Sequence, residues 1–133
     1  MPLLVEIVSP DRAAFRGEAL RLRAPGAEGS FEVLRGHAPL VAALAPGVVT
    51  VTLPDGSRAQ YAVSGGFAEV LEDHVIVLAE TVEAVGEIDT DRARAAEERA
   101  RERLAAASGA EREAAQAELD RARNRLRASM GQV

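Results

Sequence analysis

Hydrophobic and polar residues alternate in short runs along the first part of the chain. Several segments of apolar and β-branched residues end at Gly, Pro, Asp or Ser, which is typical of strands closed by turns. They lie at residues 3–8, 20–23, 48–53, 60–63, 67–71 and 74–78. In the segment 20–23 the alternation puts Leu20 and Leu22 on the buried face. Strands at this spacing predict a β-sandwich or a flattened barrel.

From Asp89 onward apolar positions recur every three or four residues, which predicts helices. Asp89 is a candidate N-cap, because its carboxylate can accept from the free amides of a first helical turn. One face of this first helix carries Ala93, Ala96, Ala100, Leu104 and Ala107. Ser108 and Gly109 break the helix, and a second one opens near Glu111. Its apolar face carries Ala115, Leu119, Ala122 and Leu126.

The two patterns together predict an α+β protein. An N-terminal β-sandwich over residues 1–87 is followed by a C-terminal antiparallel helical hairpin over residues 88–133. The facing side chains of the hairpin are mostly alanine, and each buried methyl contributes only about 0.8 kcal/mol. Ala and Arg still favour helix strongly. We therefore expect helices that form readily but pack weakly and can exchange partners, although a permanently docked structural hairpin fits the same pattern.

Four arginines add a candidate anion site to this hairpin. If the turn centres on Ser108 and Gly109, one edge of each helix faces the same side. These edges carry Arg92, Arg99, Arg121 and Arg125. Guanidinium groups gathered in this way repel one another unless an anion or acids compensate, and phosphate suits their geometry well. The alternative is that these arginines are solvated and paired with Asp89, Asp91 and Glu118, the last of which we expect to pair with Arg121.

Composition excludes several classes of function. Among the 133 residues there is no Cys and there are two His, which excludes disulfides and thiol chemistry and argues against a metal site. The net charge of −5 and the 3% aromatic content argue against nucleic-acid binding. There is no apolar run of about 18 residues. The start of the chain lacks a basic segment and is broken by Glu6, so we expect no secretory signal.

No catalytic constellation is evident. The segment from Ala62 to Gly66 has Ala where a nucleophile elbow needs Gly, and a strand rather than a helix follows it. The glycines after Ser64 instead predict a bulge or a close approach of strands. We therefore assign no catalytic residue and no metal ligand.

The order and spacing of several motifs resemble those of the epsilon subunits of bacterial F-type proton-translocating ATP synthases. The motifs are Val8-Ser9-Pro10, Gly36-His37-Ala38-Pro39-Leu40, Ser64-Gly65-Gly66-Phe67-Ala68-Glu69-Val70, Val75-x-Val77-Leu78-Ala79-Glu80 and Ile88-Asp89-x-x-Arg92-Ala93. Two departures, Arg35 before Gly36 and the segment Gly29-Ser30-Phe31-Glu32, bear on the fine detail of the ring-facing contact in this family.

The resemblance implies a non-catalytic subunit of the central stalk. In this family the sandwich binds the gamma subunit and touches the membrane rotor ring. The hairpin either folds back or extends into the catalytic head, where it inhibits ATP hydrolysis. The implied location is the peripheral, cytoplasmic face of the cell membrane, with membrane contact only through the complex.

Some members of the family also bind ATP on the folded hairpin as a regulatory ligand. The resemblance carries this role to Glu83, Ile88, Asp89, Arg92, Ala93, Arg99, Arg121 and Arg125. Ile88 and Asp89 would face the base and the arginines the phosphates, while the need for Mg²⁺ stays open. Two other functions are weighed against this one: a stand-alone ATP-sensing module, and a small hydrolase for which no constellation is found.

Overall fold

The computed structural model describes residues 2–131 and divides into two compact units, Met1–Ala84 and Val85–Val133. The division lies three residues before the expected boundary of 87/88. Residues Val85–Glu87 form a 3-10 helix, η1, which packs against the second helix and so belongs with the hairpin.

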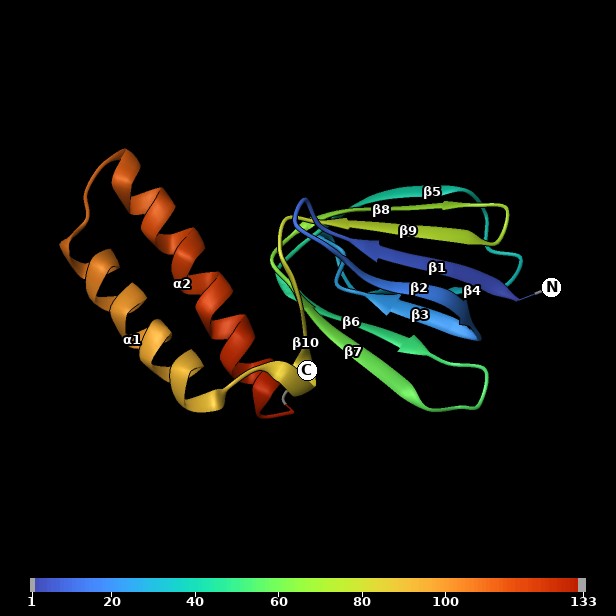
Figure 1. The fold of residues 1–133 in the computed structure, drawn as a ribbon. Helices are drawn as coiled ribbons and strands as arrows, with labels where there is room; N and C mark the ends of the chain where they lie inside the picture. Colours follow the sequence, from blue (N-terminus) through green and yellow to red (C-terminus); the bar gives the residue numbers. More distant parts are fainter. Residues whose placement is uncertain (1, 132–133) are drawn as a thin grey trace. The chain divides into compact units, whose positions relative to one another are not determined.

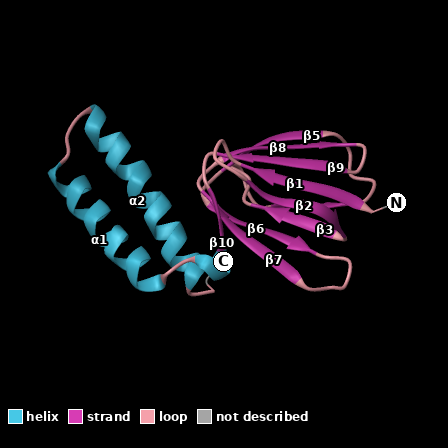
Figure 2. Cartoon of the chain, in the orientation of Figure 1, coloured by secondary structure: helices cyan, strands magenta, loops and turns pink. Residues whose placement is uncertain are grey.

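The first unit contains two five-stranded sheets (Figures 1 and 2). One sheet has the order β2-β1-β9-β8-β5 and the other the order β10-β7-β6-β3-β4. The strands of the first sheet are β1 (Leu3–Val8), β2 (Ala13–Ala19), β5 (Leu40–Leu44), β8 (Gly66–Leu71) and β9 (His74–Ala79). Those of the second are β3 (Arg21–Ala24), β4 (Phe31–Leu34), β6 (Gly47–Thr52), β7 (Arg58–Val63) and β10 (Val82–Ala84). Neighbouring strands are antiparallel except β1 and β9, which run parallel. The predicted β-sandwich is confirmed.

The sandwich core is aliphatic, as the low aromatic content requires. Alternate residues of both sheets point inward, and their largest fully buried side chains are Leu3, Ile7, Leu22, Val5, Val33, Val49, Val51, Val63, Val70, Val75 and Val77. The prediction for Leu20 was wrong: it lies before β3 and is 52% exposed, whereas Leu22 is buried. Ala24 takes the second inward position of this strand.

The second unit is a helical hairpin, as predicted. Helix α1 (Thr90–Ala106) and helix α2 (Ala110–Ser129) are joined by the short segment 107–109 and pack side by side (Figure 2). Gly109 has a φ of +62°, a conformation that glycine adopts without strain. Within residues 2–131, neither helix combines the length and apolarity that crossing a bilayer requires.

Candidate functional site

The segment from Ile88 to Ala93 forms the entrance to α1. Asp89 is the N-cap, and its Oδ1 accepts a hydrogen bond of 3.1 Å from the backbone N–H of Arg92. Ile88 is buried and Ala93 is fully buried, so these two side chains act in packing. The Arg92 side chain is exposed. The motif therefore fixes the start of the helix and leaves one guanidinium in solvent.

The two helices meet along a thin apolar seam. One buried cluster along it, within residues 2–131, consists of Ala100, Leu119 and Ala122, with Leu104 packed at its edge. Ala115 and Leu126 extend the buried face of α2, as predicted. Two leucines in the central cluster supply little apolar area compared with the sandwich core. The small side chains of this cluster are consistent with the weak helix packing that we inferred from the alanine content.

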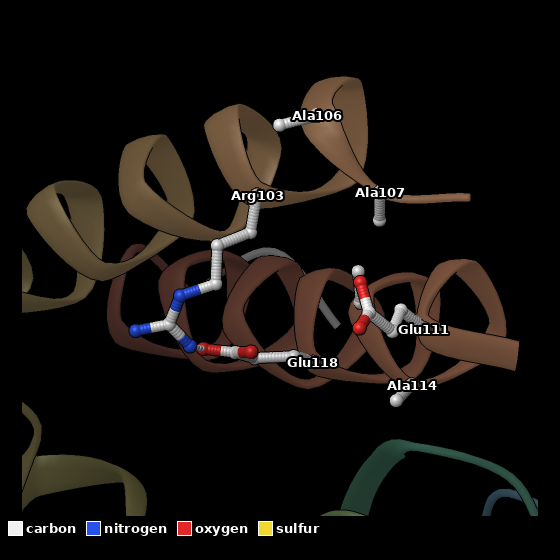
Figure 3. Close-up of a pocket in the computed structure, with 7 residues that line it drawn as sticks. Arg103, Ala106, Ala107, Glu111, Ala114 and Glu118 are labelled. Carbon is white, nitrogen blue, oxygen red and sulfur yellow. Dashed lines mark hydrogen bonds and ion pairs between the residues drawn. The ribbon is translucent and has the colours of Figure 1, made fainter.

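An ion pair crosses this seam near the closed end of the hairpin. The Nη1 of Arg103 lies 2.5 Å from the Oε1 of Glu118 (Figure 3). We had expected Glu118 to pair with Arg121 on its own helix. It pairs instead with Arg103 of the other helix. The pair shows which edges of α1 and α2 lie on the same side of the hairpin.

The four candidate arginines lie along those same edges. Arg99 and Arg92 precede Arg103 by four and eleven residues, and Arg121 and Arg125 follow Glu118 by three and seven residues, spacings that return to one face of a helix. We refer to Arg92, Arg99, Arg121 and Arg125 as the arginine face. Arg92, Arg99 and Arg121 are exposed, and Arg125 is partly buried.

The side chains of Arg92, Arg99 and Arg121 make no ion pair or hydrogen bond with any residue of the described range 2–131. In contrast, the other side of the hairpin is internally paired. There Arg101 binds Glu97 at 2.5 Å, and the Nε of Arg123 lies 4.0 Å from the same carboxylate. Within residues 2–131, Arg92, Arg99 and Arg121 therefore leave uncompensated positive charge on this side of the hairpin, and a polyanion could bind there.

Glu83 is the one predicted ATP-site residue outside the hairpin unit. It lies on the edge strand β10 opposite Ala62 of β7. The structure thus brings seven of the eight candidates into one unit and places Glu83 in the other.

A shallow cavity of roughly 330 Å³ opens at the closed end of the hairpin. Figure 3 shows Arg103 and Glu118 on one side of it and Glu111 on another. Alanines form most of the remaining lining, namely Ala106, Ala107, Ala114 and Ala115. The cavity exists because small side chains face each other where the helices end, which again indicates a loosely packed pair.

The outer surface of the first sheet exposes several large apolar side chains. Strand register aligns Val8, Leu78, Phe67 and Ala43 in one row across β1, β9, β8 and β5. Phe67 is 55% exposed and Leu78 is 52% exposed. The next row of the same surface alternates polar and apolar residues, with Glu6, Ile76, Glu69 and Val41, and a third row contains Leu4, His74 and Leu71. We call this surface the apolar sheet face. Exposed patches of this kind mark interaction sites.

A polar group lies within the apolar sheet face. The Oε1 of Glu6 lies 2.7 Å from Arg16 on β2, and its Oε2 lies 2.9 Å from the Nε2 of His74 on β9. The hydrogen bond with His74 and the nearby charge of Arg16 lower the pKa of Glu6. His74 thus has a structural partner, which sequence reasoning missed because 68 residues separate the pair.

The Ser64 hydroxyl is hydrogen-bonded within the sandwich. It accepts a hydrogen bond of 3.0 Å from the N–H of Thr81 and lies 2.7 Å from the Oγ1 of that residue. These bonds join the end of β7 to the residue before β10, and the partner of the serine hydroxyl is a threonine rather than a base. Within residues 2–131 no group of three His, Asp or Glu side chains is arranged to hold a metal ion.

Comparison with known families matches both units. The family described as ATP synthase, Delta/Epsilon chain, beta-sandwich domain matches residues 2–85. The family described as ATP synthase, Delta/Epsilon chain, long alpha-helix domain matches residues 87–130.

Individual relatives agree. The ATP synthase epsilon chain of Salinibacter ruber is 49% identical over 110 residues, which cover 77% of this chain and 74% of the relative. That of Anaeromyxobacter sp. (strain K) is 46% identical and covers 78% of each chain. A chain in the cryo-EM structure of the Euglena gracilis mitochondrial ATP synthase, OSCP/F1/c-ring, superposes with a TM-score of 0.83 at 26% identity, covering 92% of this chain and 78% of that one.

Proposed function

Because the chain belongs to the delta/epsilon chain family of ATP synthase subunits, we propose that it is a non-catalytic subunit of the central stalk. In this proposal it couples the membrane rotor ring to the catalytic head and inhibits ATP hydrolysis through its C-terminal helices. It acts at the cytoplasmic face of the membrane and reaches the membrane only through the complex. The observation that carries the proposal is the contrast between a well-packed sandwich and a thinly packed hairpin.

The contrast suits a subunit with one fixed part and one movable part. The sandwich has its own large aliphatic core and can stay bound while the hairpin changes state. The hairpin helices keep high intrinsic propensity when they separate, because they are rich in Ala, Arg and Glu. Opening therefore costs little helix structure. It exposes mainly the seam leucines, which can pack against catalytic subunits instead.

We assign the apolar sheet face to the gamma subunit. This face exposes aromatic and aliphatic side chains on a rigid sheet, the kind of surface that a permanent stalk partner would cover. The polar group of Glu6, Arg16 and His74 links three neighbouring strands within this face. An isolated ATP-sensing module would have no need of such a surface, so a pull-down with the gamma subunit distinguishes the two functions.

Replacing Phe67 with Asp is expected to weaken binding to the gamma subunit by at least about tenfold, since aromatic side chains near the centre of an interface contribute strongly. The measurement is titration of the gamma subunit with each purified variant. Leu34→Asp is the matched control, because Leu34 is similarly exposed at 49% but lies on β4 of the other sheet. Equal losses in the two variants would contradict the assignment of this face.

Removing the residues after Ile88 is expected to raise the rate of ATP hydrolysis by the assembled enzyme several-fold. The truncated chain keeps the whole sandwich with its core and lacks the helices that would enter the catalytic head. The measurement is steady-state hydrolysis by complexes reconstituted with the full or the truncated chain, normalised to the amount of chain bound. Unchanged hydrolysis at equal occupancy would rule out inhibition by the hairpin.

We further propose that ATP binds the arginine face of the folded hairpin. The side chains of Arg92, Arg99 and Arg121, which have no ionic partner among residues 2–131, supply positive charge on one side of both helices. A ligand that contacts both helices stabilises the closed hairpin, because it binds that state better than the open one. Asp89 caps the helix entrance beside this face, and the buried side chains of Ile88 and Ala93 shape it. Glu83 belongs to the other unit, so its part in the site stays a prediction from the resemblance.

A further inference from the structure

The turn between β8 and β9 has an unusual backbone. Its two residues, Glu72 and Asp73, have φ values of +49° and +63°. A two-residue hairpin turn of this kind favours Asn or Asp followed by Gly, because glycine adopts positive φ without strain. A non-glycine residue held at such a φ persists where surrounding contacts compensate for it.

The contacts of Asp73 show what compensates. Its Oδ1 accepts a hydrogen bond of 2.6 Å from the backbone N–H of Gly36, 37 residues earlier in the chain. Its backbone carbonyl accepts a second bond of 2.8 Å from the N–H of Leu4 at the start of β1. Asp73 thus ties the turn to β1 and to the loop between β4 and β5.

Two short-range hydrogen bonds also shape the tethered loop, residues 35–39. His37 donates its backbone N–H to the carbonyl of Leu34 at 3.1 Å, and the Nδ1 of His37 is hydrogen-bonded to the carbonyl of Ala38. Both of these bonds lie within the segment 34–38. Gly36, Ala38 and Pro39 are exposed. The Asp73 carboxylate therefore gives the loop backbone a long-range hydrogen bond, and this bond is charge-assisted.

The same end of the sandwich presents apolar side chains beside the loop. Leu34 precedes it and is 49% exposed, and Leu71, next to the turn, is 51% exposed. Register brings these segments together, because β5 starts at Leu40 opposite Val70 of β8 (Figure 1). Exposed apolar groups around an ordered loop favour binding, since less conformational entropy is lost on docking.

We propose that Asp73 is a positioning residue that holds the loop 35–39 in the conformation that docks on the rotor ring. This inference rests on the proposed function for the identity of the ring as the partner. The ordering of the loop by Asp73 does not depend on that identity, so the two are tested separately.

The first test measures amide hydrogen exchange of Gly36 in the isolated chain by NMR. Asp73→Gly removes the acceptor and suits the positive φ, so the turn itself should persist, and Gly36 should exchange about tenfold faster. Asp73→Asn keeps an oxygen acceptor and should retain most of the protection. Glu72→Gly is the matched control in the same turn and should leave Gly36 unchanged. Unchanged exchange in Asp73→Gly would overturn the proposal.

The second test measures docking. Because the chain has no cysteine, Ala38→Cys supplies a single attachment point for a photo-crosslinker. In the assembled complex, crosslinking to the ring should fall several-fold with Asp73→Gly and stay near the parent level with Asp73→Asn and Glu72→Gly. Equal yields in all variants would overturn the docking role. Absence of a ring crosslink in the parent, with Gly36 exchange behaving as expected, would refute the ring as partner while leaving the ordering role of Asp73 intact.

Discussion

Replacing Arg92 and Arg125 together with alanine is expected to weaken ATP binding by the isolated chain about 100-fold. The two arginines lie on different helices but on the same side of the hairpin. A hydrogen bond to a charged group contributes about 1.5–3 kcal/mol, so losing two phosphate contacts removes roughly 3 kcal/mol or more. The measurement is calorimetric titration with ATP, with and without Mg²⁺, which also decides whether the metal is needed.

The matched control replaces Arg94 and Arg127 with alanine. This double substitution changes the net charge by the same amount as the first one. Arg94 and Arg127 lie on the same two helices, each two residues after Arg92 or Arg125, so helical periodicity puts them on the other side of the hairpin. Their replacement should lower the affinity by no more than the change in net charge explains. If both double variants lost the same affinity for ATP, binding would depend only on the net charge of the chain. If neither lost affinity, the proposed site would be wrong.

The same ligand should close the hairpin. If ATP binds only the closed state, a concentration 100 times its Kd stabilises that state by about 2.7 kcal/mol. A seam built on Ala100, Leu119 and Ala122 is thin enough for such an increment to shift the balance between closed and open forms. Linkage is reciprocal, so binding of the open helices by the catalytic head should weaken ATP binding by the factor with which ATP weakens that contact.

The strands that the sequence pattern revealed differ systematically from those that it missed. The segments predicted from the sequence are all interior strands of the two sheets, where burial on one face imposes a clear alternation. The missed strands, β2, β4, β5 and β10, are the four edges of the two sheets. An edge strand has one partner and tolerates Ala, Gly and charged residues, as β2 (Ala13–Ala19) and β5 (Leu40–Leu44) show. Propensity and alternation are weakest there.

The hairpin was easier to predict because its determinants are local. An N-cap at Asp89, a glycine break at 109 and alanines at helical spacing are all visible within one or two turns. What local patterns do not reveal is pairing between distant side chains. The bonds from Glu6 to His74, from Asp73 to Gly36 and from Arg103 to Glu118 each require the tertiary fold to be known first.

The Ser64-Gly65-Gly66 motif could act through the Ser64 hydroxyl or through the close approach of strands that its glycines allow. Gly66 has a φ of +127°, and a Cβ built on it would lie 2.0 Å from the backbone oxygen of Leu78 on the neighbouring strand. Real Cβ atoms do not approach so closely, and backbone cannot move aside as a flexible side chain can. This close approach is what the glycines were predicted to allow, whereas the Ser64 hydroxyl only bridges to Thr81.

Gly66→Ala is therefore expected to destabilise the sandwich by about 3 kcal/mol or more, a large part of the stability of a small domain, because β8 and β9 must separate or the strand must deform. Chemical denaturation of the full chain measures this. Gly86→Ala is the control, since its Cβ would meet open space and its φ is not in the left-handed region. Ser64→Ala should cost about 1 kcal/mol for its lost hydrogen bonds. If Gly66→Ala were as stable as Gly86→Ala, the close approach of Gly66 to the backbone of Leu78 would not be what requires glycine at this position.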